Sequence, residues 1–498
     1  MKIIRDLIHG YIEIDEVEME FINSPSFQRL KDIRQLTAQH AFPSANHTRF
    51  EHSLGVLHLA KKAFMNLKPI IIENYQIETD VLERFMLHLR LAALLHDIGH
   101  APFSHLGEKY FRRNEIIHNL KYTIKSKSLN INSDIFEFGS NHELMSCYII
   151  LYKYSDPILR IRSDVNFELI CRMIVGAKYN NSDKWLENIL IELINSDTID
   201  ADKLDYLMRD AFMTGVSIPS IDTSRLFLNI RINPKLKRIT FKDKAIPVIQ
   251  NIIDARDTMY LFCYNHHTVV YSDFILEFFI KHMISNFERE NRFLDKLDPN
   301  DFFSCKAIAD FLVTDSVLEN QIRAPLRIPE EDRSKYTKNL INQIIGRKHL
   351  KPLWKSIYEY KEFMIKNIPD IGMRKDYELK MCDKDHSYRR LLATDIINSC
   401  ELNLGDIFII PRSNKFYSLD PDKSSFRVSI DEKDKDLREL LPQKDFREMY
   451  TNVNFYVFCL KEKIELVRNE FIKYIQMPLP QEKPSSGTEL EWLKEKFD

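Results

Sequence analysis

The sequence predicts a mainly α-helical fold with a short β-ribbon and a small α+β unit near its carboxyl end. The 498-residue chain has only 11 glycines, about 2% against a usual share of about 7%, so few tight turns are expected. Hydrophobic residues make up 44% of the chain, which is enough for a large core. Apolar residues recur at helical spacing in most windows from 16 to about 230, as in VLHLAKKAFMNL at 56–67.

The elements before residue 290 follow from local patterns. Short β-branched runs around Gly10 predict a small hairpin in residues 1–15. The alternating segment LKRITFKDKAIP at 236–247 predicts a short two-stranded ribbon. Helical spacing returns at 248–290. These elements are expected to form one core of residues 1–290.

The remaining chain is predicted to contain three parts. Residues 291–395 are helical and highly charged, with proline punctuation, and are expected to form an accessory helical region. Residues 396–477 are expected to form the α+β unit, because GDIFIIP and NVNFYVFC read as strands and KEKIELVRNEFIKYI as a helix. Residues 478–498 begin PLPQEKPSSGTE and predict a linker or tail. The chain shows no internal repeats.

Charge and cysteine content narrow the partners and the compartment. Lys and Arg number 71 against 73 Asp and Glu, so net charge predicts neither a nucleic-acid partner nor a membrane surface. No window has 18 consecutive apolar residues, and the amino terminus lacks a signal-peptide core. The seven cysteines are far apart and form no CxxC pair, which favours reduced thiols. A cytoplasmic protein is expected.

Four residues are candidate metal ligands. They are His52 in HTRFEHSLGV, the adjacent pair His96 and Asp97 in LRLAALLHDIGHAPFSH, and Asp202 in DTIDADKLDYLMRD. Imidazole and carboxylate ligands suit iron, manganese, nickel or zinc, whereas the absence of cysteine disfavours a structural zinc site. Neighbouring helical residues point about 100° apart, so the His-Asp pair needs ligands from other helices. His52 and Asp202 are expected to supply them.

The strings RFEHSLGV, LLHDIGHAPFSH and DADKLDYLMRD, in this order, resemble the HD-domain metallophosphohydrolases. They are more closely similar to the deoxynucleoside triphosphate triphosphohydrolases, over roughly residues 1–290. The resemblance implies an HD-domain helical core in which His52, His96, Asp97 and Asp202 bind the metal. It also implies a Mg²⁺ ion that accompanies the substrate triphosphate.

The resemblance implies a set of active-site residues around that metal: His100, His105, Glu108 and His142. His105 or His142 would act as the general acid towards the 5′ oxygen, a role suited to imidazole. The family pattern has an aspartate where Glu108 stands.

The family's triphosphate clamp falls on Arg49, Lys203, Tyr206 and Arg256. The residues support this independently, because the chain has no GxxxxGK or GxGxxG loop and must hold an anion with side chains and metal.

The family's sugar contacts fall on Gln35, Leu36, Asp210, Tyr264 and Asn265. Gln35 and Asp210 would bind the 3′ hydroxyl, while Leu36 and Tyr264 would exclude a 2′ hydroxyl, which would be buried without a partner. Asn265 replaces a glutamine of the animal enzyme, so a different sugar or base preference is expected.

Relatives of this class are commonly tetramers with activator nucleotides bound between subunits. The matching positions here are Lys2, Ile3, Asn23, Gln28, Lys31, Arg225, Lys242, Lys244 and His267. Asn23 stands where the animal enzyme has an aspartate that selects guanine, Lys31 replaces an arginine and His267 a lysine. These departures predict an activator other than GTP, such as a deoxynucleotide, or a different ligand.

The resemblance therefore predicts hydrolysis of a dNTP to a deoxynucleoside and triphosphate, serving pool balance or antiviral defence against phage. A second hypothesis is an HD-domain phosphodiesterase or a guanosine-tetraphosphate hydrolase. Cyclic-dinucleotide phosphodiesterases carry HDxGK and GYP strings, whereas residues 96–100 read HDIGH. A third hypothesis is a non-catalytic nucleotide sensor, against which the complete ligand set argues.

Overall fold

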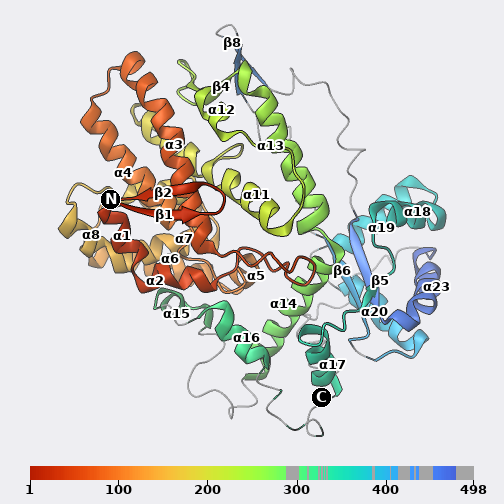
Figure 1. Cartoon of the computed structure of the whole chain (residues 1–498). Helices are drawn as coiled ribbons and strands as arrows, with labels where there is room; N and C mark the ends of the chain where they lie inside the picture. Colours follow the sequence, from red (N-terminus) through yellow and green to blue (C-terminus); the bar gives the residue numbers. More distant parts are fainter. Residues whose placement is uncertain are drawn as a thin grey trace. The chain divides into compact units, whose positions relative to one another are not determined.

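The computed structural model describes most of the chain. The described residues are 1–287, 302–310, 313–323, 326, 329, 331, 335–383, 387–403, 405–412, 427–430, 433–436 and 453–477. The chain divides into two compact units, each described by itself below. The first comprises Met1–Cys263, Lys296–Leu318 and Tyr417–Gln443, and the second Tyr264–Asp295, Glu319–Phe416 and Lys444–Asp498. The predicted mainly α-helical fold is confirmed (Figure 1).

The first unit is built mainly of helices. Its α-helices are α1 (Glu16–Ile22), α2 (Pro25–Gln28), α3 (Arg49–Tyr75), α4 (Thr79–Leu95), α5 (His105–Glu108), α6 (Arg113–Ser126), α7 (Asn141–Ile149), α8 (Ser155–Ile161), α9 (Phe167–Val175), α10 (Trp185–Ile194), α11 (Ala201–Thr214), α12 (Thr223–Leu228), α13 (Ile246–Met259) and α15 (Cys305–Ala309). Shorter 3-10 or π turns are η1 (Arg29–Asp32), η2 (Ser133–Glu137), η3 (Ile150–Tyr154), η4 (Ser182–Lys184) and η5 (Asp243–Ala245). The helices η6 (Tyr260–Tyr264) and α16 (Asp315–Arg323) each cross the boundary between the units.

Two small sheets complete the first unit. The hairpin predicted for residues 1–15 is present as β1 (Lys2–Asp6) and β2 (Gly10–Ile14), paired from Lys2 with Ile14 to Asp6 with Gly10. The second sheet has the order β3-β4-β7-β8, with strands β3 (Ile230–Ile232), β4 (Ile239–Lys242), β7 (Arg427–Ile430) and β8 (Lys433–Asp436).

The ribbon predicted at 236–247 is only partly right. That segment contributes one strand, β4, whose antiparallel partner β3 lies before it and whose second neighbour β7 pairs with it in parallel. The three-residue strand IRI is too short to show alternation. The ribbon prediction therefore placed both strands inside a segment that holds one.

Helices α3 and α4 form the centre of the first unit. A capping box of Thr48 and Glu51 begins α3, which packs along α4 and α11. Every residue from Leu87 to Leu95 of α4 is buried, where it packs against α3, α9 and α10. Each fully buried leucine there stabilises the fold by about 1.5 to 3 kcal/mol. The helix therefore ends in a closely packed part of the core, directly before His96.

The second unit combines helices with one antiparallel sheet. Its sheet has the order β5-β9-β6, with β5 (Lys351–Pro352), β9 (Phe455–Cys459) and β6 (Ile407–Pro411). Its helices are α14 (His267–Phe287), α17 (Lys335–Ile344), α18 (Ile357–Asn367), α19 (Ile371–Cys382), α20 (Ser387–Cys400), η10 (Lys461–Lys463) and α23 (Ile464–Ile475). Both strands and the helix predicted after residue 400 are present. The tail predicted at 478–498 lies outside the described residues.

Candidate metal centre and active site

The four predicted metal ligands meet in the first unit. His52 comes from the first turn of α3, His96 and Asp97 directly follow α4, and Asp202 lies in the first turn of α11. His52 Nε2 lies 2.9 Å from Asp202 Oδ1 and 3.6 Å from Asp97 Oδ2. His96 Nε2 lies 3.4 Å from Asp97 Oδ1 and 3.8 Å from Asp202 Oδ1. Three helices thus bring four donors to one point.

The two imidazoles are prepared to bind a cation through Nε2. His96 Nδ1 lies 2.8 Å from the Ala93 carbonyl, which has no proton to give, so Nδ1 carries the proton. His52 Nδ1 donates in the same way to Asp205 at 2.7 Å. His96 Nε2 therefore keeps a lone pair and is buried without a hydrogen-bond partner, while His52 Nε2 faces Asp202 and Asp97, where a proton and a cation compete for it. Such buried nitrogens fit a site for a divalent cation.

The ring geometry fits shared coordination as well. The centroids of His52 and His96 are 5.2 Å apart and the ring planes are inclined by 71°. Two imidazoles that bind one ion at about 2.1 Å each, with tetrahedral angles, have centroids about 5 Å apart. Nitrogen and carboxylate donors without thiolate suit iron, manganese, nickel or zinc. This donor set could therefore hold any of these ions.

Neighbouring charged groups shift the pKa values of His52 and Asp97. Burial opposes the imidazolium of His52, but Asp202 and Asp205 outweigh it and raise its pKa to about 10. Burial also opposes ionisation of Asp97, but Arg49, His96 and His100 hold its pKa well below the usual value. Protons and divalent cations compete for the same imidazole lone pair. The concentration of negative charge that favours a proton here equally favours a cation.

Arg49 lies beside this group, as the predicted clamp requires. Its guanidinium is buried, with Nη1 donating to Asp97 Oδ2 at 2.7 Å and Nε to Ser104 Oγ at 3.0 Å. Ser104 follows Phe103, and both have positive φ angles, 57° and 53°. A positive φ angle at a residue other than glycine costs about 1 to 3 kcal/mol and persists only where neighbouring groups hold the backbone. Asp315 holds it by accepting the Phe103 N–H at 2.7 Å.

The second set of predicted residues gathers around Glu108. Its carboxylate lies 3.1 Å from His105 Nδ1 and 2.9 Å from His142 Nδ1, and it accepts the backbone N–H of His142 at 3.1 Å. The rings of His100 and His142 are stacked, with centroids 4.0 Å apart and planes inclined by 18°. His100 Nε2 lies 3.2 Å from Asp97 Oδ1, so this set adjoins the metal donors. We call the set of His100, His105, Glu108 and His142 the Glu108 cluster.

The protonation of these histidines differs. Burial lowers the pKa of His142, but Glu108 outweighs it and raises that pKa above the usual value. Burial and the charge of Arg49 lower the pKa of His100 well below its usual value. Burial lowers the pKa of His105 as well, but its side chain is 69% exposed to solvent, so this shift is weaker than that of the buried His100. Near neutral pH, His142 is therefore the imidazole best able to hold a proton for donation.

Gly99 explains how the HDIGH segment reaches His142. A Cβ at Gly99 would lie 2.3 Å from the backbone nitrogen of Ser146 and 2.6 Å from the carbonyl oxygen of His142. Ser146 Oγ accepts the Gly99 N–H at 2.9 Å and donates to the His96 carbonyl at 2.6 Å. The turn after α4 is thus pressed against α7, which carries His142. Only glycine permits this approach.

The remaining clamp residues lie on α11 and α13. Lys203 Nζ is bound to Asp200 at 2.5 Å and to the Ser196 carbonyl at 2.6 Å, so it would have to exchange partners to hold a phosphate. Burial raises the pKa of Tyr206 well above its usual value, while the nearby charge of Arg256 opposes this shift. Tyr206 and Arg256 are therefore close enough to interact. Their role towards a substrate stays a prediction.

The predicted sugar contacts fall partly in the first unit. Asp210 is buried and accepts from His47 Nε2 at 2.7 Å, while the backbone N–H of Gln35 donates to the His47 carbonyl at 3.0 Å. Gln35 and Asp210 are thus joined through His47. Leu36, which follows Gln35, is half-buried. Tyr264 and Asn265 belong to the second unit, so their place in a sugar site stays a prediction.

The predicted activator positions lie at the surface of the first unit, apart from His267 in the second. Lys2, Ile3, Asn23, Lys31, Arg225, Lys242 and Lys244 are exposed, and Gln28 is half-buried. Gln28 Nε2 donates to the Ile22 carbonyl at 2.6 Å, and Lys31 Nζ lies 4.7 Å from the centroid of the Phe50 ring. A single chain does not test a site between subunits, so nucleotide activation stays a prediction.

Sequence reasoning missed several residues that support the site. Asp205 and His47 hold predicted site residues by hydrogen bonds, as described above, and Ser104 and Ser146 brace the backbone between them. Asp205 lies three residues after Asp202, so helical spacing could have placed it near the same site. No sequence signal separates a ligand from a carboxylate that orients a ligand.

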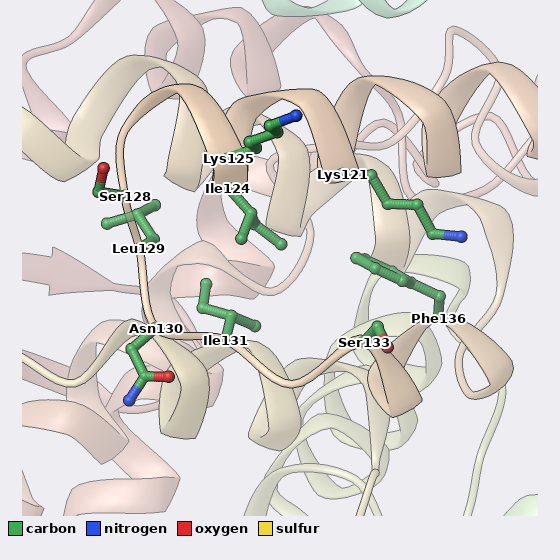
Figure 2. Close-up of a pocket in the computed structure, with 9 residues that line it drawn as sticks. All are labelled: Lys121, Ile124, Lys125, Ser128, Leu129, Asn130, Ile131, Ser133 and Phe136. Atoms are coloured by element: carbon green, nitrogen blue, oxygen red, sulfur yellow. The ribbon is translucent and has the colours of Figure 1, made fainter.

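A surface groove of about 430 Å³ lies elsewhere in the first unit (Figure 2). Ile124, Ile131 and Phe136 face one another across it, and Lys121 and Lys125 lie along one side. Its full lining is Lys121, Ile124, Lys125, Ser128, Leu129, Asn130, Ile131, Ser133 and Phe136. This lining contains no histidine, cysteine or carboxylate. The groove therefore lacks the ligands that a metal site requires.

Two further observations concern disulfides and membrane-spanning helices. None of the seven cysteines, all within the described residues, forms a disulfide, as their spacing predicted. Among the helices that the structure describes, none has the length and apolar character needed to cross a bilayer.

Comparison with known proteins agrees with this site. Residues 49–150 match the HD domain family. A deoxynucleoside triphosphate triphosphohydrolase SAMHD1 homolog from Dictyostelium discoideum is 27% identical over 95% of this chain and 80% of its own length. Deoxynucleoside triphosphate triphosphohydrolase SAMHD1 from Bos taurus is 30% identical over 53% of this chain. That alignment spans 45% of the bovine protein, so the chain matches about half the length of this curated relative.

Solved structures share the fold. A phosphohydrolase from Bacteroides thetaiotaomicron superposes with a TM-score of 0.62 at 20% identity, covering 93% of this chain and all of that chain. A hypothetical protein from Aquifex aeolicus gives the same TM-score at 22% identity over 94% of this chain and 99% of its own. At these identities the likeness concerns the fold alone.

The chain carries an HD domain over residues 49–150 and is similar to HD-superfamily phosphohydrolases. Within that superfamily its similarity is to the deoxynucleoside triphosphate triphosphohydrolases, as the motifs around His52, Asp97 and Asp202 implied. An HD domain implies binding of a divalent metal, and the donors described above could hold one.

Proposed function

We propose that this chain is a metal-dependent dNTP triphosphohydrolase that converts a dNTP and water to a deoxynucleoside and inorganic triphosphate. The observation that carries the proposal is the juxtaposition of two groups. His52, His96, Asp97 and Asp202 offer donors for a cation, and beside them the Glu108 carboxylate lies 2.9 Å from His142 Nδ1 and raises the pKa of that imidazole. Relatives named as deoxynucleoside triphosphate triphosphohydrolases supply the substrate class.

The cation and the protein divide the chemistry between them. A divalent cation held by these donors supplies Lewis acidity, which lowers the pKa of water from about 16 towards about 7 and polarises phosphoryl oxygens. Arg49, Lys203 and Arg256 would bind the triphosphate, which arrives with Mg²⁺, and fix the α-phosphorus next to the donors. Tyr206 would complete this clamp with a hydrogen bond from its hydroxyl.

His142 is assigned as the general acid. Water adds to the α-phosphorus and loses one proton to solvent as the bond from phosphorus to the 5′ oxygen breaks, and His142 gives its own proton to that oxygen. Glu108, which is ionised because its pKa is held well below the usual value despite burial, stabilises the imidazolium until transfer. General acid catalysis of this kind contributes about 10² to 10⁴-fold. His105 and His100, with lowered pKa values, would hydrogen-bond the phosphate or the attacking water.

Sugar selection and regulation complete the proposal. Gln35 and Asp210 would bind the 3′ hydroxyl, with Leu36, Tyr264 and Asn265 around the sugar. Activation by a nucleotide at the exposed positions Lys2, Ile3 and Arg225 requires assembly of subunits, and a homotetramer is the expected state. Removal of dNTPs in the cytoplasm would serve pool balance or defence against phage.

Product analysis tests the proposal. The purified chain is loaded with Mn²⁺, incubated with Mg²⁺ and each dNTP singly and in mixtures, and the products are separated by ion exchange. Inorganic triphosphate and deoxynucleoside in equal amounts are expected, with mixtures revealing activation. Release of pyrophosphate instead, or cleavage only of a cyclic dinucleotide or of guanosine tetraphosphate, would establish the other phosphohydrolase classes. Nucleotide binding without any turnover would indicate a sensor.

A further inference from the structure

Asp205 is the centre of a fully buried hydrogen-bond network behind His52. Its Oδ2 accepts from His52 Nδ1 at 2.7 Å and from Arg209 Nε at 2.9 Å. Its Oδ1 accepts from His9 Nε2 at 2.6 Å and from Arg209 Nη2 at 2.9 Å. A carboxylate offers about four lone-pair sites, so these four donors saturate it. Asp205 thus has one orientation in which every partner is satisfied.

His9 reaches this network from the loop of the amino-terminal hairpin. The Asp6 side chain shapes that loop by accepting the backbone N–H of Ile8 at 2.9 Å and of His9 at 2.8 Å. The other oxygen of Asp6 accepts from Arg209 Nη1 at 2.9 Å. The hairpin is therefore joined to α11 at two points, and both lead to Asp205. In Figure 1 the β1–β2 ribbon lies beside α11.

Gly55 of α3 leaves the space that the Asp205 carboxylate occupies. It lies in the interior of α3, where glycine costs about 1 kcal/mol relative to alanine. A Cβ at this position would lie 1.8 Å from Asp205 Oδ1 and 2.6 Å from Arg209 Nη2. Because no side chain fits there, the backbone of α3 comes against the carboxylate one turn after His52. The hairpin, α3 and α11 thus all contact Asp205 or its partners.

We propose that His9 is a positioning residue for the metal centre: its hydrogen bond holds Asp205 in the orientation that receives the Nδ1 proton of His52. His52 Nε2 then presents its lone pair towards Asp97 and Asp202. The inference rests on the cation site of the proposed function but not on its substrate. Without His9, Oδ1 of Asp205 keeps only the bond from Arg209 Nη2, so one lone pair shielded from water loses its donor and the carboxylate holds His52 less firmly.

The expected loss of metal affinity can be judged from other groups that hydrogen-bond to metal-binding histidines. Loss of such a hydrogen-bonding partner typically lowers metal affinity by about 10 to 100-fold. Because His9 acts on His52 only through Asp205, we expect His9→Ala to weaken binding by about 10-fold, the lower end of this range. His9→Gln keeps an amide donor near the position of Nε2 and is expected to recover most of the affinity, whereas the shorter His9→Asn does not reach it.

The test measures Mn²⁺ affinity of the full chain without nucleotide. Metal-free protein is prepared with a chelator and titrated with Mn²⁺, free Mn²⁺ being followed by electron paramagnetic resonance. Thermal unfolding of the metal-free variants is measured in parallel. His58→Phe is the matched control, because the His58 ring stacks on His9, with centroids 5.2 Å apart, and Phe keeps a ring there. This control is expected to bind Mn²⁺ as the unaltered chain does.

The outcomes separate positioning from simple stability. The proposal requires that His9→Ala bind Mn²⁺ more weakly, that His9→Gln restore binding and that His58→Phe leave it unchanged. Unchanged Mn²⁺ affinity in folded His9→Ala overturns it, as does a Gln variant as weak as the Ala variant. If His9→Ala does not fold, the Asn and Gln variants decide, and equal affinities overturn the proposal. A His9-dependent Mn²⁺ site in a chain that releases no triphosphate refutes the proposed substrate alone.

Discussion

Two neighbouring histidine groups in the first unit use the same side chain for different purposes. In the pair His52 and His96, each ring gives its Nδ1 proton to a protein oxygen and keeps Nε2 for a cation. In the Glu108 cluster, the Glu108 carboxylate raises the pKa of His142, while burial lowers that of the stacked His100. His52 and His142 both have a carboxylate at Nδ1, so the difference between them lies at Nε2, which in His52 faces Asp97 and Asp202.

Ring orientation separates the two groups as well. The ring nitrogens of His100, His105 and His142 are also close enough together to suggest a metal site. The rings of His52 and His96 are steeply inclined, at 71°, so their lone pairs can converge. Those of His100 and His142 are almost parallel, at 18°, and in-plane lone pairs of parallel rings do not converge on one ion. We therefore infer that the cation binds in the first group and that the second group supplies the proton.

The largest effect is expected from removing the His-Asp pair. His96→Ala combined with Asp97→Ala deletes two of four donors, so the chain should bind no stoichiometric metal, and dNTP hydrolysis should fall by about a thousandfold or more. Metal content by plasma mass spectrometry and triphosphate release are measured together. A purified double variant that still hydrolyses dNTPs would contradict the assignment.

His142→Ala should separate the groups. Loss of the general acid should lower kcat by about 10² to 10⁴-fold, while metal content stays that of the unaltered chain. His118→Ala, at an exposed histidine of α6, is the matched control and should keep full activity. If the His142 variant lost its metal, the three histidines would have to be regarded as a second cation site.

Glu108→Gln should change the pH dependence of the rate. A general acid works while protonated, so the rate falls as pH rises through the raised pKa of His142. Without the carboxylate charge that pKa falls, and the descending limb should move down by about 1 to 3 pH units. The rate of the variant relative to the unaltered chain is therefore lower at pH 8 than at pH 6. Identical profiles would remove His142 from the role of acid.

The smallest effect is expected at the turn between the two groups. Gly99→Ala places a methyl group 2.3 Å from a backbone nitrogen of α7 and should lower the free energy of unfolding by about 1 to 3 kcal/mol. Urea denaturation measures this. The control Gly372→Ala meets only a carboxylate oxygen of Asp370, at 3.2 Å. Equal stability of both variants would show that α4 and α7 can separate without cost.

Local patterns predicted the elements better than their partners. The hairpin around Gly10, the buried half of α4 and the strands and helix after residue 400 depend on propensity and spacing within a few residues. The pairing of β4 with β3 and β7 depends on residues as far away as Val428. A strand's partner is chosen by tertiary packing, so the 236–247 prediction was wrong about it.

The sequence by itself determined which residues bear chemistry: the motifs around His52, Asp97 and Asp202 carry donors of a type that local spacing and family resemblance both single out. Tertiary structure alone decided what each donor does. Asp202 and Asp205 lie one helical turn apart on α11, yet one faces the cation donors and the other receives the proton of His52. The reason is physical, since a carboxylate's role depends on the atoms opposite it, and those come from α3 and the hairpin.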